Sequence, residues 1–183
     1  MKPLFDKTVI YFPTLKKYGL GGGNLQAEYK YGKKLRSSIL LTCKHIEVTK
    51  TPSKLKEHIE YGGCTELIIV GHGGAATEQG LANKIGGTSW YSTPQYDAGK
   101  LAVDMYQHVG KEQMQKIETV WLWICHSSRN GVGVCVKNAL AELCPNATIY
   151  ATPHNIGGIF DLLYHEAKKT RKYDIYDDSF VAM

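Results

Sequence analysis

Apolar residues are distributed along this chain in two distinct patterns. Five short runs are mostly apolar, as expected of strands buried on both faces: residues 8–12, 38–42, 67–70, 120–124 and 147–151. Elsewhere apolar residues recur every three or four positions, which predicts amphipathic helices at 53–61, 97–109, 130–143 and 159–169. Residues 26–35 are polar and fit either a helix or a loop.

The order of these elements predicts an α/β fold. Strands that alternate with helices imply a three-layer sandwich with a mostly parallel central sheet. The length of 183 residues, with no visible repeat or linker, favours a single domain over residues 1–183. Because neither a secretory leader nor an apolar run of about 20 residues is visible, we expect a cytoplasmic protein, or one exported without a classical signal peptide, and no membrane partner.

The charge and the cysteines narrow the chemistry. The formal net charge is +5, and the aromatic residues are too scattered to predict nucleic-acid binding. Five cysteines without close pairs argue against a zinc site or a disulfide framework, so we expect no metal and reduced thiols. The glycine-rich segment 19–23 lacks the Gly-Lys-Ser/Thr of a phosphate-binding loop, and no cofactor is predicted.

Two of the predicted strands end in a reactive side chain. Residues 66–74 read Glu-Leu-Ile-Ile-Val-Gly-His-Gly-Gly, and residues 119–128 read Thr-Val-Trp-Leu-Trp-Ile-Cys-His-Ser-Ser. Because the carboxyl ends of parallel strands face the ligand crevice, neighbouring strands would place His72 beside Cys125. An imidazole beside a thiol favours the thiolate, which is the nucleophile of covalent catalysis.

The residues around these two side chains resemble a known family. Gly71-His72-Gly73, Cys125-His126-Ser127 and their spacing of 53 residues are similar to the caspase-like cysteine peptidases of clan CD. That group includes metacaspases, CHAT domains and the autoprocessing domains of bacterial toxins, and the resemblance covers roughly residues 60–130. It implies a caspase-like fold and a cysteine endopeptidase that acts on a peptide or protein substrate, its own chain included.

Roles for single residues follow from this chemistry. Cys125 would be the nucleophile and His72 its acid/base partner, while the backbone N–H groups of Gly73 and Cys125 would stabilise the oxyanion. His126 is an alternative base, although a sequence neighbour of Cys125 would point away from it in a continuing strand. Ser127 and Ser128 would orient the loop or, as we expect, cap the following helix.

Three further residues are candidate substrate contacts. Trp90 lies in the long segment after His72, and His154 follows the last predicted strand. Trp123 stands where metacaspases carry an acidic residue that helps to select basic substrates, so no preference for Arg or Lys is implied. The alternation of Trp123 with Leu122 also fits a place in the core.

Other functions remain open at this point. A catalytically inactive, CHAT-like interaction or signalling domain would carry the same fold, and a nucleotide-binding domain would need a Gly-x-Gly-x-x-Gly after the first strand, which is missing. The related toxin domains are switched on by inositol hexakisphosphate, an anionic activator. Four clustered basic residues could bind such an anion or form a solvated face: Lys30, Lys33, Lys34 and Arg36.

Overall fold

The computed structural model describes most of the chain. The described residues are 7–13, 23–36, 46–73, 84–85, 96–154, 156 and 180–183. The predicted strand at 38–42, the predicted helix at 159–169 and the segment that contains Trp90 lie outside them.

Within the described residues, a six-stranded sheet lies at the centre of the molecule, with the strand order β2-β1-β3-β6-β7-β8. Its strands are β1 (Thr8–Tyr11), β2 (Ile46–Thr49), β3 (Glu66–Val70), β6 (Thr119–Trp123), β7 (Thr148–Ala151) and β8 (Val181–Ala182). All neighbours pair in parallel except β7 and β8, which are antiparallel. A separate antiparallel pair is formed by β4 (Lys84–Ile85) and β5 (Tyr96–Asp97). The strands that lead to His72 and Cys125, β3 and β6, are therefore direct neighbours.

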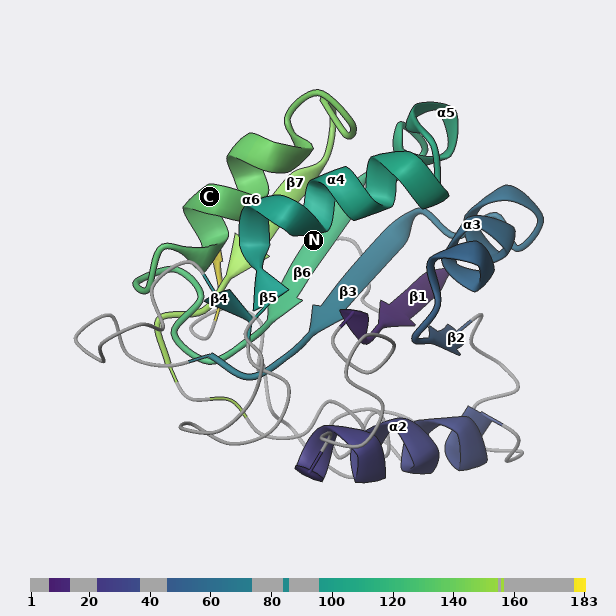
Figure 1. Cartoon of the computed structure of the whole chain (residues 1–183), viewed down its shortest axis with the longest axis horizontal. Coiled ribbons are helices and arrows are strands. Elements are labelled where there is room, and N and C mark those ends of the chain that lie inside the picture. The colour runs from purple at the N-terminus through teal and green to yellow at the C-terminus, as the bar shows by residue number, and fades with distance from the viewer. Residues whose placement is uncertain are drawn as a thin grey trace.

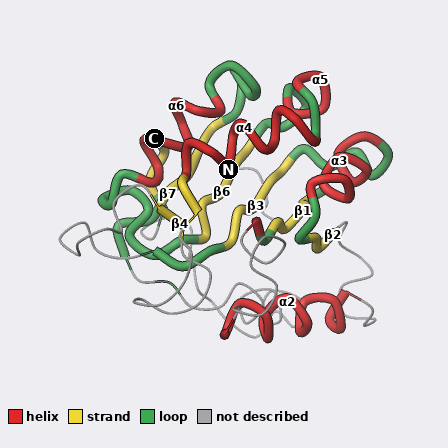
Figure 2. Tube along the Cα trace, in the orientation of Figure 1, coloured by secondary structure: helices red, strands yellow, loops and turns green. Residues whose placement is uncertain are grey.

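Helices cover both faces of the sheet (Figure 1). One face carries α3 (Pro52–Glu60), α4 (Ala98–His108), α5 (Lys111–Met114) and α6 (Val132–Leu140), and α2 (Gly23–Arg36) lies on the other. In Figure 2 the strands accordingly run between two layers of helix. The predicted α/β architecture with a mostly parallel sheet is confirmed, and residues 26–35 belong to a helix.

The strands β1, β3 and β6 each contribute to two cores because their side chains alternate between the faces of the sheet. In β6, Val120 and Leu122 join the core beneath α3–α6, whereas Trp121 and Trp123 join the core on the α2 side. Both sets are buried, so the strand reads as a continuous apolar run in the sequence. The Trp121 ring also stacks on Tyr150 of β7, with 4.2 Å between the ring centroids.

A buried polar cluster joins the amino ends of the central strands. Glu66, at the start of β3, accepts a hydrogen bond of 2.8 Å from Nε1 of Trp121 and another from the hydroxyl of Thr8. These bonds satisfy polar groups that would otherwise be costly to bury. The cluster lies at the opposite end of β3 and β6 from His72 and Cys125, so it stabilises the sheet away from the candidate site.

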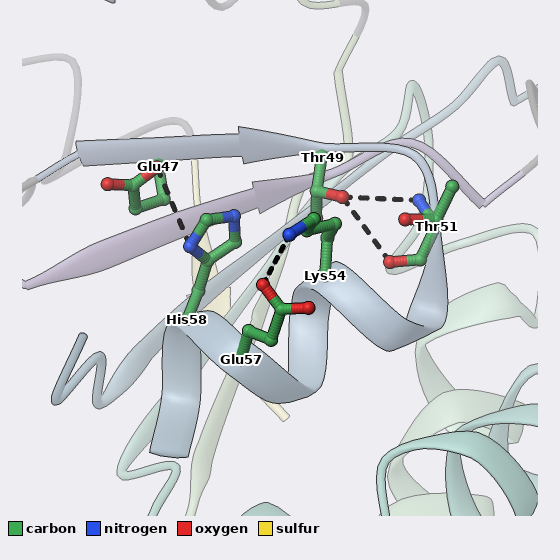
Figure 3. A network of polar contacts seen from close by, with 6 residues as sticks. All are labelled: Glu47, Thr49, Thr51, Lys54, Glu57 and His58. Carbon is green, nitrogen blue, oxygen red and sulfur yellow. Dashed lines mark hydrogen bonds and ion pairs between the residues drawn. The ribbon is translucent and has the colours of Figure 1, made fainter. Parts of the chain in front are cut away.

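Polar contacts also attach α3 to the edge of the sheet (Figure 3). Nδ1 of His58 on α3 lies 3.5 Å from a carboxylate oxygen of Glu47 on β2. The Thr49 hydroxyl oxygen accepts a hydrogen bond of 3.2 Å from the Thr51 N–H, one residue before the helix begins at Pro52. Helix α3 is thus attached to β2 near both of its ends. These contacts support the edge of the sheet beside β1.

Candidate functional site

The register of β3 and β6 places His72 and Cys125 at matching positions. Val70 pairs with Trp123, and the Gly71 N–H extends the ladder by donating to the Trp123 carbonyl at 3.3 Å. His72 lies two residues beyond Val70, and Cys125 lies two residues beyond Trp123. The two residues therefore follow the carboxyl ends of paired parallel strands, and β3 and β6 lie side by side in Figure 1.

Gly73 brings the two segments into contact. A Cβ atom on this residue would overlap the Cys125 carbonyl oxygen and would lie 2.6 Å from Cγ2 of Ile124. Contacts that short are not tolerated by real side chains, so only glycine fits here. Among the described residues, neither the Gly73 nor the Cys125 N–H has a hydrogen-bond acceptor.

The side chain of His72 is half-buried. Its Nε2 atom is shielded from solvent and has no hydrogen-bond partner in the part of the chain that the structure describes. Burial lowers the pKa of His72 because the charged imidazolium loses its hydration. The ring is therefore neutral at neutral pH, and a neutral ring can accept a proton.

Cys125 differs from the two buried cysteines of the described residues, Cys64 and Cys144. Its side chain is partly exposed, and its Sγ accepts a hydrogen bond of 3.4 Å from the Ile156 N–H. Cys64 and Cys144 are buried, and loss of solvation raises the pKa of each thiol to about 12. Those two remain protonated and inert at neutral pH, which is the behaviour of structural cysteines.

The side chains of His126 and Ser127 fix the loop that follows Cys125, and they form their hydrogen bonds away from its thiol. Nδ1 of His126 lies 3.0 Å from the Pro153 carbonyl oxygen, so this ring is engaged away from the thiol. The hydroxyl oxygen of Ser127 accepts a hydrogen bond of 3.0 Å from the Thr152 N–H. The expected capping role of Ser127 is therefore wrong, since its hydroxyl is used to fasten the loop to the end of β7.

Asn130, which precedes the N-cap residue Gly131, contacts the first turn of α6. Its side-chain oxygen accepts a bond of 3.0 Å from the Val132 N–H in the first turn of α6, and its amide donates to the Cys125 carbonyl at 3.3 Å. The side chain thus links the main chain of Cys125 to the start of the helix. An Asn close to a helix start is a capping signal that could have revealed the first of these contacts.

The remaining candidates occupy different environments. The structure places Trp123 in the core instead of a substrate cleft, because its side chain is only 5% exposed and packs on Phe180 at 5.2 Å between centroids. His154 is exposed, and its carbonyl accepts a hydrogen bond from the His126 N–H, so it lies beside the loop of Cys125. Trp90 lies outside the described residues.

The basic residues at 30–36 lie on α2, on the face of the sheet opposite α3–α6. The side chains of Lys30, Lys33 and Lys34 are exposed there.

In the described part of the chain, no group of three or more His, Cys, Asp or Glu side chains could hold a metal ion. None of the described helices is long and apolar enough to cross a membrane.

Comparison with known proteins assigns no family to the chain. No family model matches it, and none of the curated proteins matches it significantly.

Proposed function

We propose that this protein is a cysteine peptidase in which Cys125 is the nucleophile and His72 transfers the proton. The observation that carries the proposal is the shared register of the two segments: Val70 pairs with Trp123, and the main chain meets again where Gly73 lies against Cys125. An imidazole and a partly exposed thiol at one edge of a parallel sheet are what acyl transfer through a thioester requires.

The chemistry runs as an acyl transfer. The neutral His72 ring takes the thiol proton at Nε2, the Cys125 sulfur attacks the substrate carbonyl, and the imidazolium then protonates the leaving amine. The Gly73 and Cys125 N–H groups receive the developing oxyanion, and one such donor is worth about 10²–10³ in kcat. Water finally hydrolyses the thioester, with His72 again acting as base.

The assignment to a particular family of cysteine peptidases is part of the same proposal. We place the chain with the caspase-like peptidases, where the order of His before Cys and the mostly parallel sheet agree. Self-cleavage is part of that expectation. With Trp123 in the position of an acidic specificity residue and buried in the core, strong cleavage after Arg or Lys is not expected from this position.

The alternative is a binding domain of the CHAT kind without activity. In the part of the chain that the structure describes, Nε2 of His72 is enclosed and has no hydrogen-bond partner, and this favours the enzyme, because unsatisfied buried polar atoms are rare. A purely structural histidine at this position would gain stability from a partner for that atom.

The test is labelling by peptides that carry a halomethyl ketone, with the modified cysteine located by mass spectrometry. A peptidase is labelled at Cys125, and labelling and peptide cleavage are lost in Cys125→Ala and His72→Ala. The control is Cys135→Ala, because Cys135 is also partly exposed but lies on α6. Labelling that is equal at Cys125 and Cys135 and indifferent to His72→Ala would refute the peptidase assignment.

A further inference from the structure

The loop that begins at Cys125 is fastened to the residues that follow β7. We call these residues, Thr152, Pro153, His154 and Ile156, the β7 extension. The contacts between the two segments are His126 N–H to His154 carbonyl (3.0 Å), Ser128 N–H to Thr152 carbonyl (3.0 Å), Thr152 N–H to Ser127 Oγ (3.0 Å) and His126 Nδ1 with the Pro153 carbonyl (3.0 Å). The attachment is therefore made by main chain and side chain together.

His126 adopts an unusual backbone conformation at the centre of this attachment. Its φ is +55°, a left-handed conformation that residues with a side chain rarely adopt. Such a conformation persists only where surrounding contacts impose it, and both the N–H and the ring of His126 bind the β7 extension. The His126 contacts thus hold the loop in a shape that it would not keep by itself.

The attachment places the main chain of Ile156 beside the sulfur of Cys125. The Ile156 nitrogen lies 3.4 Å from Cys125 Sγ, while the Ile156 carbonyl oxygen lies 3.8 Å from the same sulfur. The N–H is the closer group, and a thiolate accepts an N–H bond more strongly than a neutral thiol does. The carbonyl has the opposite preference, but at its greater distance its effect is weaker.

We propose that the main-chain N–H of Ile156 is a catalytic donor to the Cys125 sulfur, and that His126 is the positioning residue that holds it there. This inference rests on the proposed function, because it adds a group to the same nucleophile. When the thiol proton passes to Nε2 of His72, the sulfur keeps the electron pair and the N–H bond stabilises it. When that electron pair forms the bond to the substrate carbonyl carbon, the hydrogen bond from the Ile156 N–H to the sulfur weakens. The hydrogen bond therefore acts by increasing the fraction of Cys125 that is thiolate.

The main-chain donor can be removed by a single substitution. Ile156→Pro lacks the N–H, and the matched control Ile156→Ala keeps it while shortening the side chain. The measurement is the rate of alkylation of Cys125 by iodoacetamide as a function of pH, resolved by mass spectrometry. We expect the pH midpoint of alkylation to rise in Ile156→Pro and the rate at neutral pH to fall about tenfold, a loss typical of a hydrogen bond to a charged group. Ile156→Ala should keep the midpoint.

A second pair tests the positioning role. His126→Gly and His126→Asn both tolerate the left-handed backbone, but only Asn offers an amide donor near the position of Nδ1. The midpoint should rise in His126→Gly and be restored in His126→Asn. This pair decides the question if Ile156→Pro proves unfolded by circular dichroism.

Alkylation needs no peptide turnover, so the two proposals fail separately. A midpoint that stays unchanged in folded Ile156→Pro, or that is equal in His126→Gly and His126→Asn when the proline variant is unfolded, overturns this inference even if peptides are cleaved. A shifted midpoint in a protein that cleaves no peptide supports the donor and removes the peptidase function.

Discussion

Gly73 lies directly against the main chain of Cys125. A Cβ on Gly73 would overlap the Cys125 carbonyl oxygen, and it would also lie 3.2 Å from Nδ2 of Asn130. The segments that follow β3 and β6 are therefore closer than two residues with side chains could be. This contact links the register of the sheet to the geometry of the candidate site, because a displacement at Gly73 must also displace the main chain of Cys125.

Gly73→Ala should damage the site more than the fold. The added methyl must push Cys125 and Ile124 aside, and a displacement of about 1 Å at a reacting group can cost about 10²-fold in rate. We expect peptide cleavage and Cys125 labelling to fall by about that factor, with a loss of about 1–3 kcal/mol in the free energy of unfolding.

Gly99→Ala is the matched control for this variant. Gly99 lies in the first turn of α4, where a Cβ would meet only the carboxylate of the exposed residue Asp97, at 3.1 Å. Cleavage should be retained there. Equal rates for Gly73→Ala and the unmodified protein would mean that the two segments do not meet in solution.

The half-buried imidazole of His72 predicts a dependence of stability on pH. Burial lowers its pKa below the ordinary value of 6.5, so the unfolded chain binds the proton more tightly than the folded protein. The stability that the neutral ring contributes is present above pH 6.5 and is lost as the pH falls towards the lowered folded pKa. Urea unfolding of the protein and of His72→Gln, at about pH 7.5 and about pH 5, measures this difference.

The unmodified protein should lose more stability than His72→Gln between these two pH values, since glutamine does not titrate. The other histidines are present in both proteins and cancel in the comparison. A pH dependence that is the same in both would show that the His72 ring is solvated rather than buried.

The parts of the fold that could be predicted are those with a local signal. The apolar runs of β3 and β6 and the helical spacing of α3, α4 and α6 are determined by the burial of neighbouring residues, and the structure confirms them. β2 was missed because Ile46–Thr49 is a four-residue edge strand that contains Glu47. α5, with four residues, and β8, with two, are too short to produce a periodicity.

The candidate site divides in the same way. His72 and Cys125 could be identified because motif and strand end coincide, but the pairing of Val70 with Trp123 is a non-local relationship that periodicity does not contain. The contact of Ile156 with Cys125 is made through the main-chain N–H, which every residue except proline carries. The residue type at position 156 therefore could not have predicted this contact.

Glu66 offers a test of stability that leaves the site intact. Glu66→Ala removes the acceptor for Nε1 of Trp121 and for the Thr8 hydroxyl, and each buried donor left unpaired costs about 1–3 kcal/mol. We expect a loss of about 2–4 kcal/mol in the free energy of unfolding, measured with urea. Glu66→Gln keeps an acceptor for Trp121 and should lose less. Similar losses in the two variants would show that the hydrogen bonds contribute little.

The basic face of α2 predicts binding of a polyphosphate. Lys30, Lys33 and Lys34 follow the i, i+3, i+4 spacing that places side chains on one side of a helix, and all three are exposed. Clustered ammonium groups neutralise phosphates through charge-assisted hydrogen bonds. Calorimetric titration with inositol hexakisphosphate at about 0.15 M salt should give binding that is lost in Lys33→Ala/Lys34→Ala.

The control for this titration is Lys137→Ala, which removes one exposed lysine from α6 on the other face of the sheet and should leave the heat unchanged. Peptide cleavage measured alongside separates binding from activation. If α2 holds the activator, cleavage rises with saturation in the unmodified protein and in Lys137→Ala but not in the double variant. Absence of both heat and a gain in cleavage would leave this face as ordinary solvated surface, since exposed lysines by themselves need no ligand.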